Sequence, residues 1–83
     1  MIYKIKFEKR AFQELDKLDQ IISRRILRNI KELKKNFHTK DVKRLKGKDI
    51  YRLRVGNYRV LFYIENDLIS ILKVGHRKKI YKY

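Results

Sequence analysis

Residues 51–60 read Tyr-Arg-Leu-Arg-Val-Gly-Asn-Tyr-Arg-Val, and this stretch decides the fold. Apolar and basic side chains alternate on both sides of Gly56-Asn57, a pair that favours a tight two-residue turn between antiparallel strands. The pattern predicts a hairpin of strands 50–55 and 58–64. In this register Arg54 lies directly opposite Arg59 and shares a face with Arg52 and Tyr63. The opposite, core-facing side carries Tyr51, Leu53, Val55, Tyr58, Val60 and Phe62.

The segment before the hairpin changes its period from strand to helix. Residues 1–7 alternate apolar and basic, which predicts a strand whose core face carries Tyr3, Ile5 and Phe7. Apolar residues at helical spacing follow, and Asp19 divides them as the N-cap of a second helix. The two predicted apolar stripes consist of Ala11, Phe12, Leu15 and Leu18, and of Ile22, Ile26, Ile30, Leu33 and Phe37.

The remaining segments complete an α+β fold. Residues 38–48 are mostly polar and predict a loop, and Asn66-Asp67 forms a second turn into a last strand over 68–75. Its first residues are apolar on both faces, which indicates an interior strand. The predicted order is β-α-α-β-β-β, with a helical hairpin on one face of a small, mainly antiparallel sheet. We expect one domain over residues 1–83.

The amino-acid composition limits the classes of function that the protein can have. The chain has 24 Lys and Arg against 9 Asp and Glu, a formal charge of +15, which points to a polyanionic partner. The absence of cysteine excludes disulfides and cysteine-based zinc sites, and with two histidines we expect neither a metal site nor a cofactor. Apolar runs stay well short of the roughly 18 residues of a membrane span. We expect a cytoplasmic protein that does not enter membranes.

Basic residues form two candidate nucleic-acid sites. Like charges directly across a strand pair repel, and phosphate would relieve the repulsion among Arg52, Arg54 and Arg59 because guanidinium groups bind phosphate in a bidentate manner. A solvated basic face in a basic protein remains the alternative. After the last strand, basic residues alternate with Tyr81 and Tyr83, a combination that suits single-stranded nucleic acid but also a solubilising terminus. These basic residues are His76, Arg77, Lys78, Lys79 and Lys82.

The run 51–60, residues 73–81 (Lys-Val-Gly-His-Arg-Lys-Lys-Ile-Tyr) and the element order together resemble the RelE/ParE superfamily of bacterial and archaeal toxins. The resemblance covers essentially the whole chain, including Leu45-Lys46-Gly47 before the hairpin. It implies a RelE-like fold and, for the RelE branch, a ribosome-dependent endoribonuclease that needs no metal ion. In that reaction a nucleotide of the messenger in the ribosomal A site attacks the adjacent phosphate with its own 2′-hydroxyl.

The resemblance also implies roles for individual residues. It assigns catalysis to Arg54, Arg59, Arg77 and Tyr81, and we expect RNA contacts from Arg52, His76, Lys78, Lys79 and Lys46. RelE itself carries lysines where this chain has Arg52 and Arg54. Because arginine hardly releases its proton, both are better interpreted as phosphate clamps, which leaves Tyr81 or His76 to move protons.

The resemblance implies partners as well. A RelE-like toxin acts on the ribosome and its messenger and is held inactive by a RelB-like antitoxin, which we expect to be acidic and which can form a heterotetramer with it. Two alternatives remain open. The ParE branch shares the fold but poisons DNA gyrase, and a basic RNA-binding module without catalysis would need only the charge and the aromatic tail.

Overall fold

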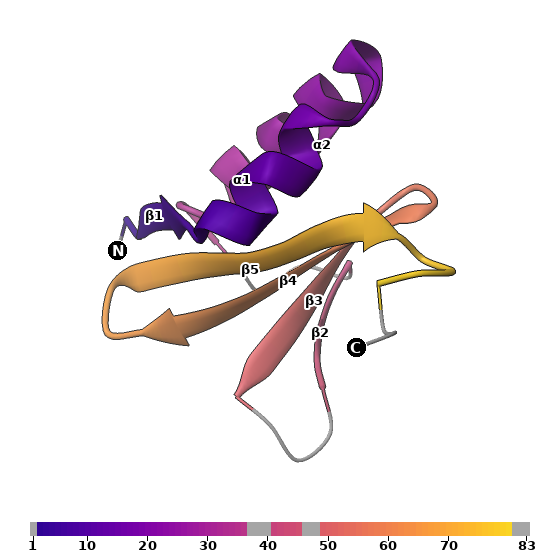
Figure 1. Cartoon of the computed structure of the whole chain (residues 1–83). Helices are drawn as coiled ribbons and strands as arrows, with labels where there is room; N and C mark the ends of the chain where they lie inside the picture. Colours follow the sequence, from indigo (N-terminus) through magenta and orange to yellow (C-terminus); the bar gives the residue numbers. More distant parts are fainter. Residues whose placement is uncertain (1, 37–40, 46–48, 81–83) are drawn as a thin grey trace.

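A computed structural model describes residues 2–36, 41–45 and 49–80 (Figure 1). The elements follow the chain as β1 (Lys4–Phe7), α1 (Lys9–Asp16), α2 (Gln20–Glu32), β2 (Val42–Arg44), β3 (Ile50–Val55), β4 (Tyr58–Glu65) and β5 (Leu68–His76). The predicted α+β class, with a first strand, two helices and a β-rich second half, is confirmed.

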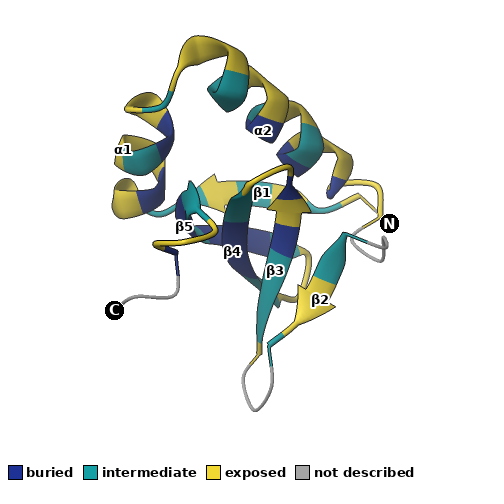
Figure 2. Ribbon diagram, turned by 90° about the vertical axis from the view of Figure 1, so that its right-hand side faces the viewer, coloured by how far each residue is buried: buried dark blue, intermediate teal, exposed yellow. Residues whose placement is uncertain are grey.

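The strands form one mixed sheet in the order β1-β5-β4-β3-β2. β1 runs parallel to β5, and all other neighbours are antiparallel. Both helices lie on one side of this sheet and diverge from their short connection (Figures 1 and 2). β5 lies between β1 and β4, so its predicted interior position is confirmed.

The segment 38–48, predicted as a loop, contains the short edge strand β2. β2 pairs with β3, and Lys43 lies opposite Arg52. The strand has only three residues, and two of them are basic, so its sequence shows no alternation of apolar and polar side chains. Backbone pairing with β3 therefore creates a strand that the side-chain pattern did not predict.

The core fills the space between the helices and the covered face of the sheet. Its fully buried members include Ile26 and Ile30 of α2, Phe62 of β4 and Ile71 of β5. Phe12, which we expected on the buried stripe of α1, is 60% exposed. Ala11 and Leu15 occupy the buried face of that helix, and Phe12 follows Ala11 by one residue, a rotation of about 100° that turns it toward α2.

The ends of α2 are set by local hydrogen bonds. The Asp19 carboxylate accepts from the backbone N–H of Ile21 at 2.9 Å, which confirms the predicted N-cap. α2 ends at Glu32, and the next N–H, that of Leu33, bonds to the carbonyl of Ile30 in a tighter turn. The apolar stripe of α2 nevertheless continues through the buried Leu33; Phe37 lies outside the described residues.

Neither helix has the length and hydrophobicity of a membrane span within the described part of the chain.

β5 contains a bulge, and just beyond it a side chain of α1 bonds to the strand. Phe62 of β4 pairs with Ile71 and Leu61 pairs with Lys73, so Leu72 is an extra residue in the ladder. β1 has ended by this point, and beyond it the N–H of Val74 donates to the Glu14 carboxylate of α1 at 3.0 Å. A side chain of α1 thus supplies an acceptor on the side of β5 that β1 no longer covers.

Candidate nucleic-acid interface

The face of the sheet away from the helices carries the predicted arginine cluster. Arg54 pairs with Arg59 and Val55 with Tyr58, so the predicted hairpin register is confirmed. Because Leu53 and Val55 belong to the core under the helices, Arg52 and Arg54 point to the opposite side. We call Arg52, Arg54 and Arg59 the arginine face.

Arg59 is oriented by the hairpin turn itself. Its Nη1 donates to the carbonyl oxygens of Gly56 and Tyr58, both at 2.9 Å. Gly56 adopts a φ of +58°, a conformation that costs other residues strain, and this turn geometry brings its carbonyl to the guanidinium. These two bonds fix the direction of the Arg59 guanidinium at the turn.

Arg54 is held from the other side by an acidic residue that the sequence did not reveal. Its Nη2 lies 2.9 Å from Oδ1 of Asp41, and its backbone N–H donates to the Asp41 carbonyl at 2.8 Å. Asp41 directly precedes β2. Because β2 itself lacked a sequence pattern, no signal in the sequence placed Asp41 beside Arg54.

Arg52 lies in a row of side chains that crosses four strands. Lys43 of β2 pairs with Arg52, Arg52 with Leu61 of β4, and Leu61 with Lys73 of β5. Paired residues share a face, so Lys43 and Lys73 extend the positive charge on both sides of Arg52. The Arg52 Nε is buried and has no hydrogen-bond partner within the described structure. Sequence reasoning did not assign Lys43 or Lys73 to this face.

The segment after β5 reaches the same end of the sheet. The N–H of Arg77 donates to the carbonyl of Asn57 at 2.8 Å, which ties this segment to the β3–β4 turn. The segment then turns back beneath the end of β5, on the side away from the helices (Figure 1). The Cδ1 of Ile80 lies 3.4 Å from where a Cβ of Gly75 would be, and Gly75 pairs with Arg59. Ile80 therefore packs beside the arginine face.

The other predicted site residues are not all brought to this face. His76 pairs with Tyr58, and the two rings meet edge to face at 5.4 Å. Tyr58 belongs to the core side of the hairpin, so His76 points away from Arg59, and its Nδ1 accepts from the backbone N–H of Lys78 at 3.2 Å. Lys78 and Lys79 are exposed in the segment after β5. Lys46 and Tyr81 lie outside the described residues.

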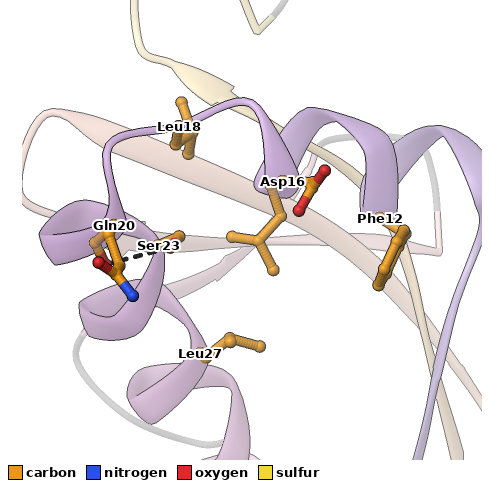
Figure 3. Close-up of a pocket in the computed structure, with 7 residues that line it drawn as sticks. Phe12, Asp16, Leu18, Gln20, Ser23 and Leu27 are labelled. Carbon is orange, nitrogen blue, oxygen red and sulfur yellow. Dashed lines mark hydrogen bonds between the residues drawn. The ribbon is translucent and has the colours of Figure 1, made fainter.

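A separate apolar pocket lies between the helices on the other side of the molecule (Figure 3). Its volume is about 300 Å³. Phe12 and Leu27 line it from opposite sides (Figure 3), and the buried core residue Leu15 also lines it. Asp16, Leu18, Gln20 and Ser23 complete the lining. The pocket has no titratable side chain other than Asp16 among these residues, which suits an apolar ligand surface rather than catalysis.

Comparison with known sequences gives consistent matches. The model of the family described as "ParE toxin of type II toxin-antitoxin system, parDE" matches residues 5–81. Toxin RelE3 of Methanocaldococcus jannaschii is 36% identical over 85 residues, which cover 96% of this chain and 97% of that protein. A putative RelE-like toxin protein of Escherichia coli is 30% identical over 95% of this chain and 87% of its own length.

Solved structures match over the same extent. The RelB–RelE antitoxin–toxin complex from Methanococcus jannaschii contains a chain 36% identical to this one, with a TM-score of 0.77 and coverage of 93% of this chain and 95% of that one. The archaeal RelE–RelB complex from Pyrococcus horikoshii OT3 gives 31% identity and a TM-score of 0.80, with 95% and 99% coverage.

Proposed function

This chain belongs to the RelE/ParE family of toxins from type II toxin–antitoxin systems, and we propose that it inhibits translation as a ribosome-dependent messenger-RNA endoribonuclease. The observation that carries the proposal is that Arg54, Arg59 and the Arg77 backbone lie together at one end of the sheet face away from the helices. Together with the charge of +15, this end of the sheet suits a phosphate of single-stranded RNA.

The proposed reaction requires stabilisation of the negative charge that develops on the scissile phosphate. The 2′-oxygen of one nucleotide forms a bond to the adjacent phosphorus, and the bond from phosphorus to the 5′-oxygen of the next nucleotide breaks. The products are a 2′,3′-cyclic phosphate and a free 5′-hydroxyl. Negative charge grows on the phosphate oxygens in the transition state, and donors already oriented toward them lower the barrier. Arg59, held by two carbonyls, and Arg54, held by Asp41, are suited to this role.

Arg52 and Lys43 are proposed to hold the messenger backbone next to the scissile phosphate. A buried N–H without an acceptor costs about 1–3 kcal/mol, and the Arg52 Nε has none among the described residues. A phosphate oxygen would remove this cost if the guanidinium turns toward the ligand. Lys43 lies beside Arg52 on the edge strand and is exposed, so it can contact the next phosphate.

Two protons must also move, one from the 2′-hydroxyl and one to the leaving 5′-oxygen. We assign one of these transfers to Tyr81. The support is the position of Ile80, its neighbour in the sequence, beside the arginine face. His76 is less suited because its ring lies against Tyr58 and its Nδ1 already accepts a hydrogen bond.

The test is primer extension on a defined messenger in a purified translation system. The active protein should produce new stops at A-site codons only when ribosomes are present, and Arg59→Ala and Tyr81→Phe should abolish them. Arg44→Ala is the matched control, because Arg44 pairs with Tyr51 and so lies on the other side of the sheet. An intact messenger with normal translation would contradict the proposal.

Gyrase poisoning is the second candidate, because the family model that matches is that of ParE toxins. A supercoiling assay with purified gyrase distinguishes the two. A gyrase poison should trap cleaved DNA, and this activity should survive Arg59→Ala and Tyr81→Phe. If RNA is bound, the messenger stays intact on ribosomes and gyrase is unaffected, the protein is a binding module without either activity.

We further propose that an acidic antitoxin inactivates the protein. Two solved relatives are described as antitoxin–toxin complexes, and the charge of +15 favours an acidic partner. The pocket between the helices is the proposed seat for an apolar residue of that partner, and the exposed Arg24 and Arg28 lie on the helix that forms one of its walls. Leu27→Glu should weaken the toxin–antitoxin affinity and leave messenger cleavage unchanged.

A further inference from the structure

We infer that Asp41 is an internal counterion of the arginine face, which competes with RNA phosphate for Arg54. The inference rests on the proposed RNA-binding function of this face. Asp41 meets Arg54 twice, through the carboxylate at 2.9 Å and through the backbone carbonyl at 2.8 Å. The second contact fixes the Asp41 backbone. The Asp41 carboxylate is therefore already placed beside the Arg54 guanidinium, and little conformational entropy is lost when the ion pair forms.

The charge arrangement explains why a counterion is useful here. Arg54 and Arg59 are directly paired across the hairpin, where like charges repel. The hairpin carbonyls that bind Arg59 bring no net charge, whereas the Asp41 carboxylate neutralises Arg54. The protein without RNA thereby keeps two paired arginines at a lower electrostatic cost.

The same contact limits RNA binding. The side chains of Arg54 and Asp41 are 51% and 36% exposed, so an incoming phosphate can reach both. Phosphate oxygens and a carboxylate oxygen seek the same guanidinium donors. Each phosphate that Arg54 neutralises therefore displaces Asp41 or brings a second negative charge next to it. Asp41 thus sets the affinity of the face for RNA and its dependence on salt.

The test is a double-mutant cycle on RNA binding. The probe is a fluorescent single-stranded 2′-O-methyl RNA, which binds but has no free 2′-hydroxyl to attack its phosphate, and anisotropy is measured from low to physiological salt. Asp41→Asn keeps the side-chain shape and the backbone contact. It should bind the probe about two- to fivefold more tightly at low salt, the range expected for releasing an exposed ion pair.

The salt slope gives a second readout. If Arg54 is freed to neutralise one more phosphate, the slope of log affinity against log salt should become steeper by about 0.7. The matched control is Asp49→Asn, which removes one negative charge from a 2.7 Å ion pair with Arg44 in the neighbouring part of the sheet. This control should change the affinity less than Asp41→Asn and leave the slope unchanged.

The cycle separates this inference from the proposed function. In an Arg54→Ala background, Asp41→Asn should have no larger effect than Asp49→Asn, because the competing arginine is gone. If Arg54→Ala weakens binding but Asp41→Asn matches Asp49→Asn in both backgrounds, the counterion role is overturned and the RNA site stands. If Arg54→Ala and the wild type bind equally at every salt concentration, the RNA site itself is overturned, and the inference with it.

Discussion

Glu14 and Val74 lie 60 residues apart in the chain, and a 3.0 Å hydrogen bond joins the carboxylate of one to the backbone N–H of the other. The bond is partly buried and lies beyond the end of β1, where β5 is paired with β4 on one side and has no strand on the other. The second carboxylate oxygen of Glu14 lies 3.4 Å from Arg10, one helical turn earlier. Glu14 therefore has one contact that anchors α1 to the sheet and one on the surface.

We predict that Glu14→Ala lowers the free energy of unfolding by about 1–3 kcal/mol, because it leaves the Val74 N–H without its acceptor. Arg10→Ala removes only the surface ion pair and should cost less than about 0.5 kcal/mol. Urea denaturation followed by circular dichroism measures both values. Equal losses for the two variants would show that the bond to Val74 adds nothing.

Gly56 sits at the turn that positions Arg59, with a φ of +58°. An added methyl group would meet the Arg25 guanidinium at 3.0 Å, but that side chain can move, so backbone strain dominates. We predict that Gly56→Ala costs about 1–2 kcal/mol of stability.

Asn57→Ala is the control for this turn, because Asn57 is not among the described residues with positive φ. It should change the free energy of unfolding by less than about 0.5 kcal/mol. A Gly56→Ala variant as stable as the wild type in thermal unfolding would contradict the strain argument.

At the scale of elements, α2 depends on its N-cap. The first-turn N–H groups of a helix have no partner within the helix, and Asp19 supplies an acceptor for one of them. We predict that Asp19→Ala costs about 0.5–2 kcal/mol. Asp19→Asn keeps an acceptor oxygen and should stay close to the wild type. Chemical denaturation of both variants tests the cap, and a full loss of stability in Asp19→Asn would assign the effect to charge instead.

The elements also show what the sequence could and could not predict. The hairpin register followed from Gly56-Asn57 and the alternation around it, because a two-residue turn leaves one way to pair the strands. The position of Asp19 followed from the break between two helical stripes. Each of these features is local, with cause and effect only a few residues apart.

Features that depend on distant pairing could not be predicted in this way. β2 exists because β3 offers it a partner, and it brings Lys43 to the arginine face and Asp41 to Arg54. The bulge at Leu72 decides which face Lys73 joins. Phe12 is exposed because the two helices diverge and leave a gap beside it. The spacing of apolar residues along one helix does not reveal how far away the next helix lies. The arginines of the site were thus predictable, and their orienting partners were not.

At the scale of the whole molecule, the charge of +15 acts on stability and on binding in opposite directions. Self-repulsion destabilises a compact, strongly charged chain, and salt screens it. We predict that raising sodium chloride from about 20 to about 300 mM raises the melting temperature. Each 1 kcal/mol that screening adds to the free energy of unfolding should raise the melting temperature by about 4–8 °C. RNA affinity should fall over the same range.

Differential scanning fluorimetry and anisotropy on the same samples test this pair of expectations. An equal concentration of an uncharged osmolyte is the control, because it changes the solvent without screening charge. A melting temperature that falls with salt would mean that specific ion pairs, such as that of Arg54 with Asp41, outweigh the repulsion.

The parallel pairing of β1 with β5 joins the first strand to the last one, across nearly the whole length of the chain. During synthesis β1 leaves the ribosome long before β5 exists, so the nascent chain has no partner for it and cannot close the sheet. A product that stops before Leu68 lacks the strand that joins β1 to β4. Interrupted translation of this messenger therefore yields an unfolded fragment rather than a partly active toxin, and the order of synthesis itself delays the appearance of the folded protein.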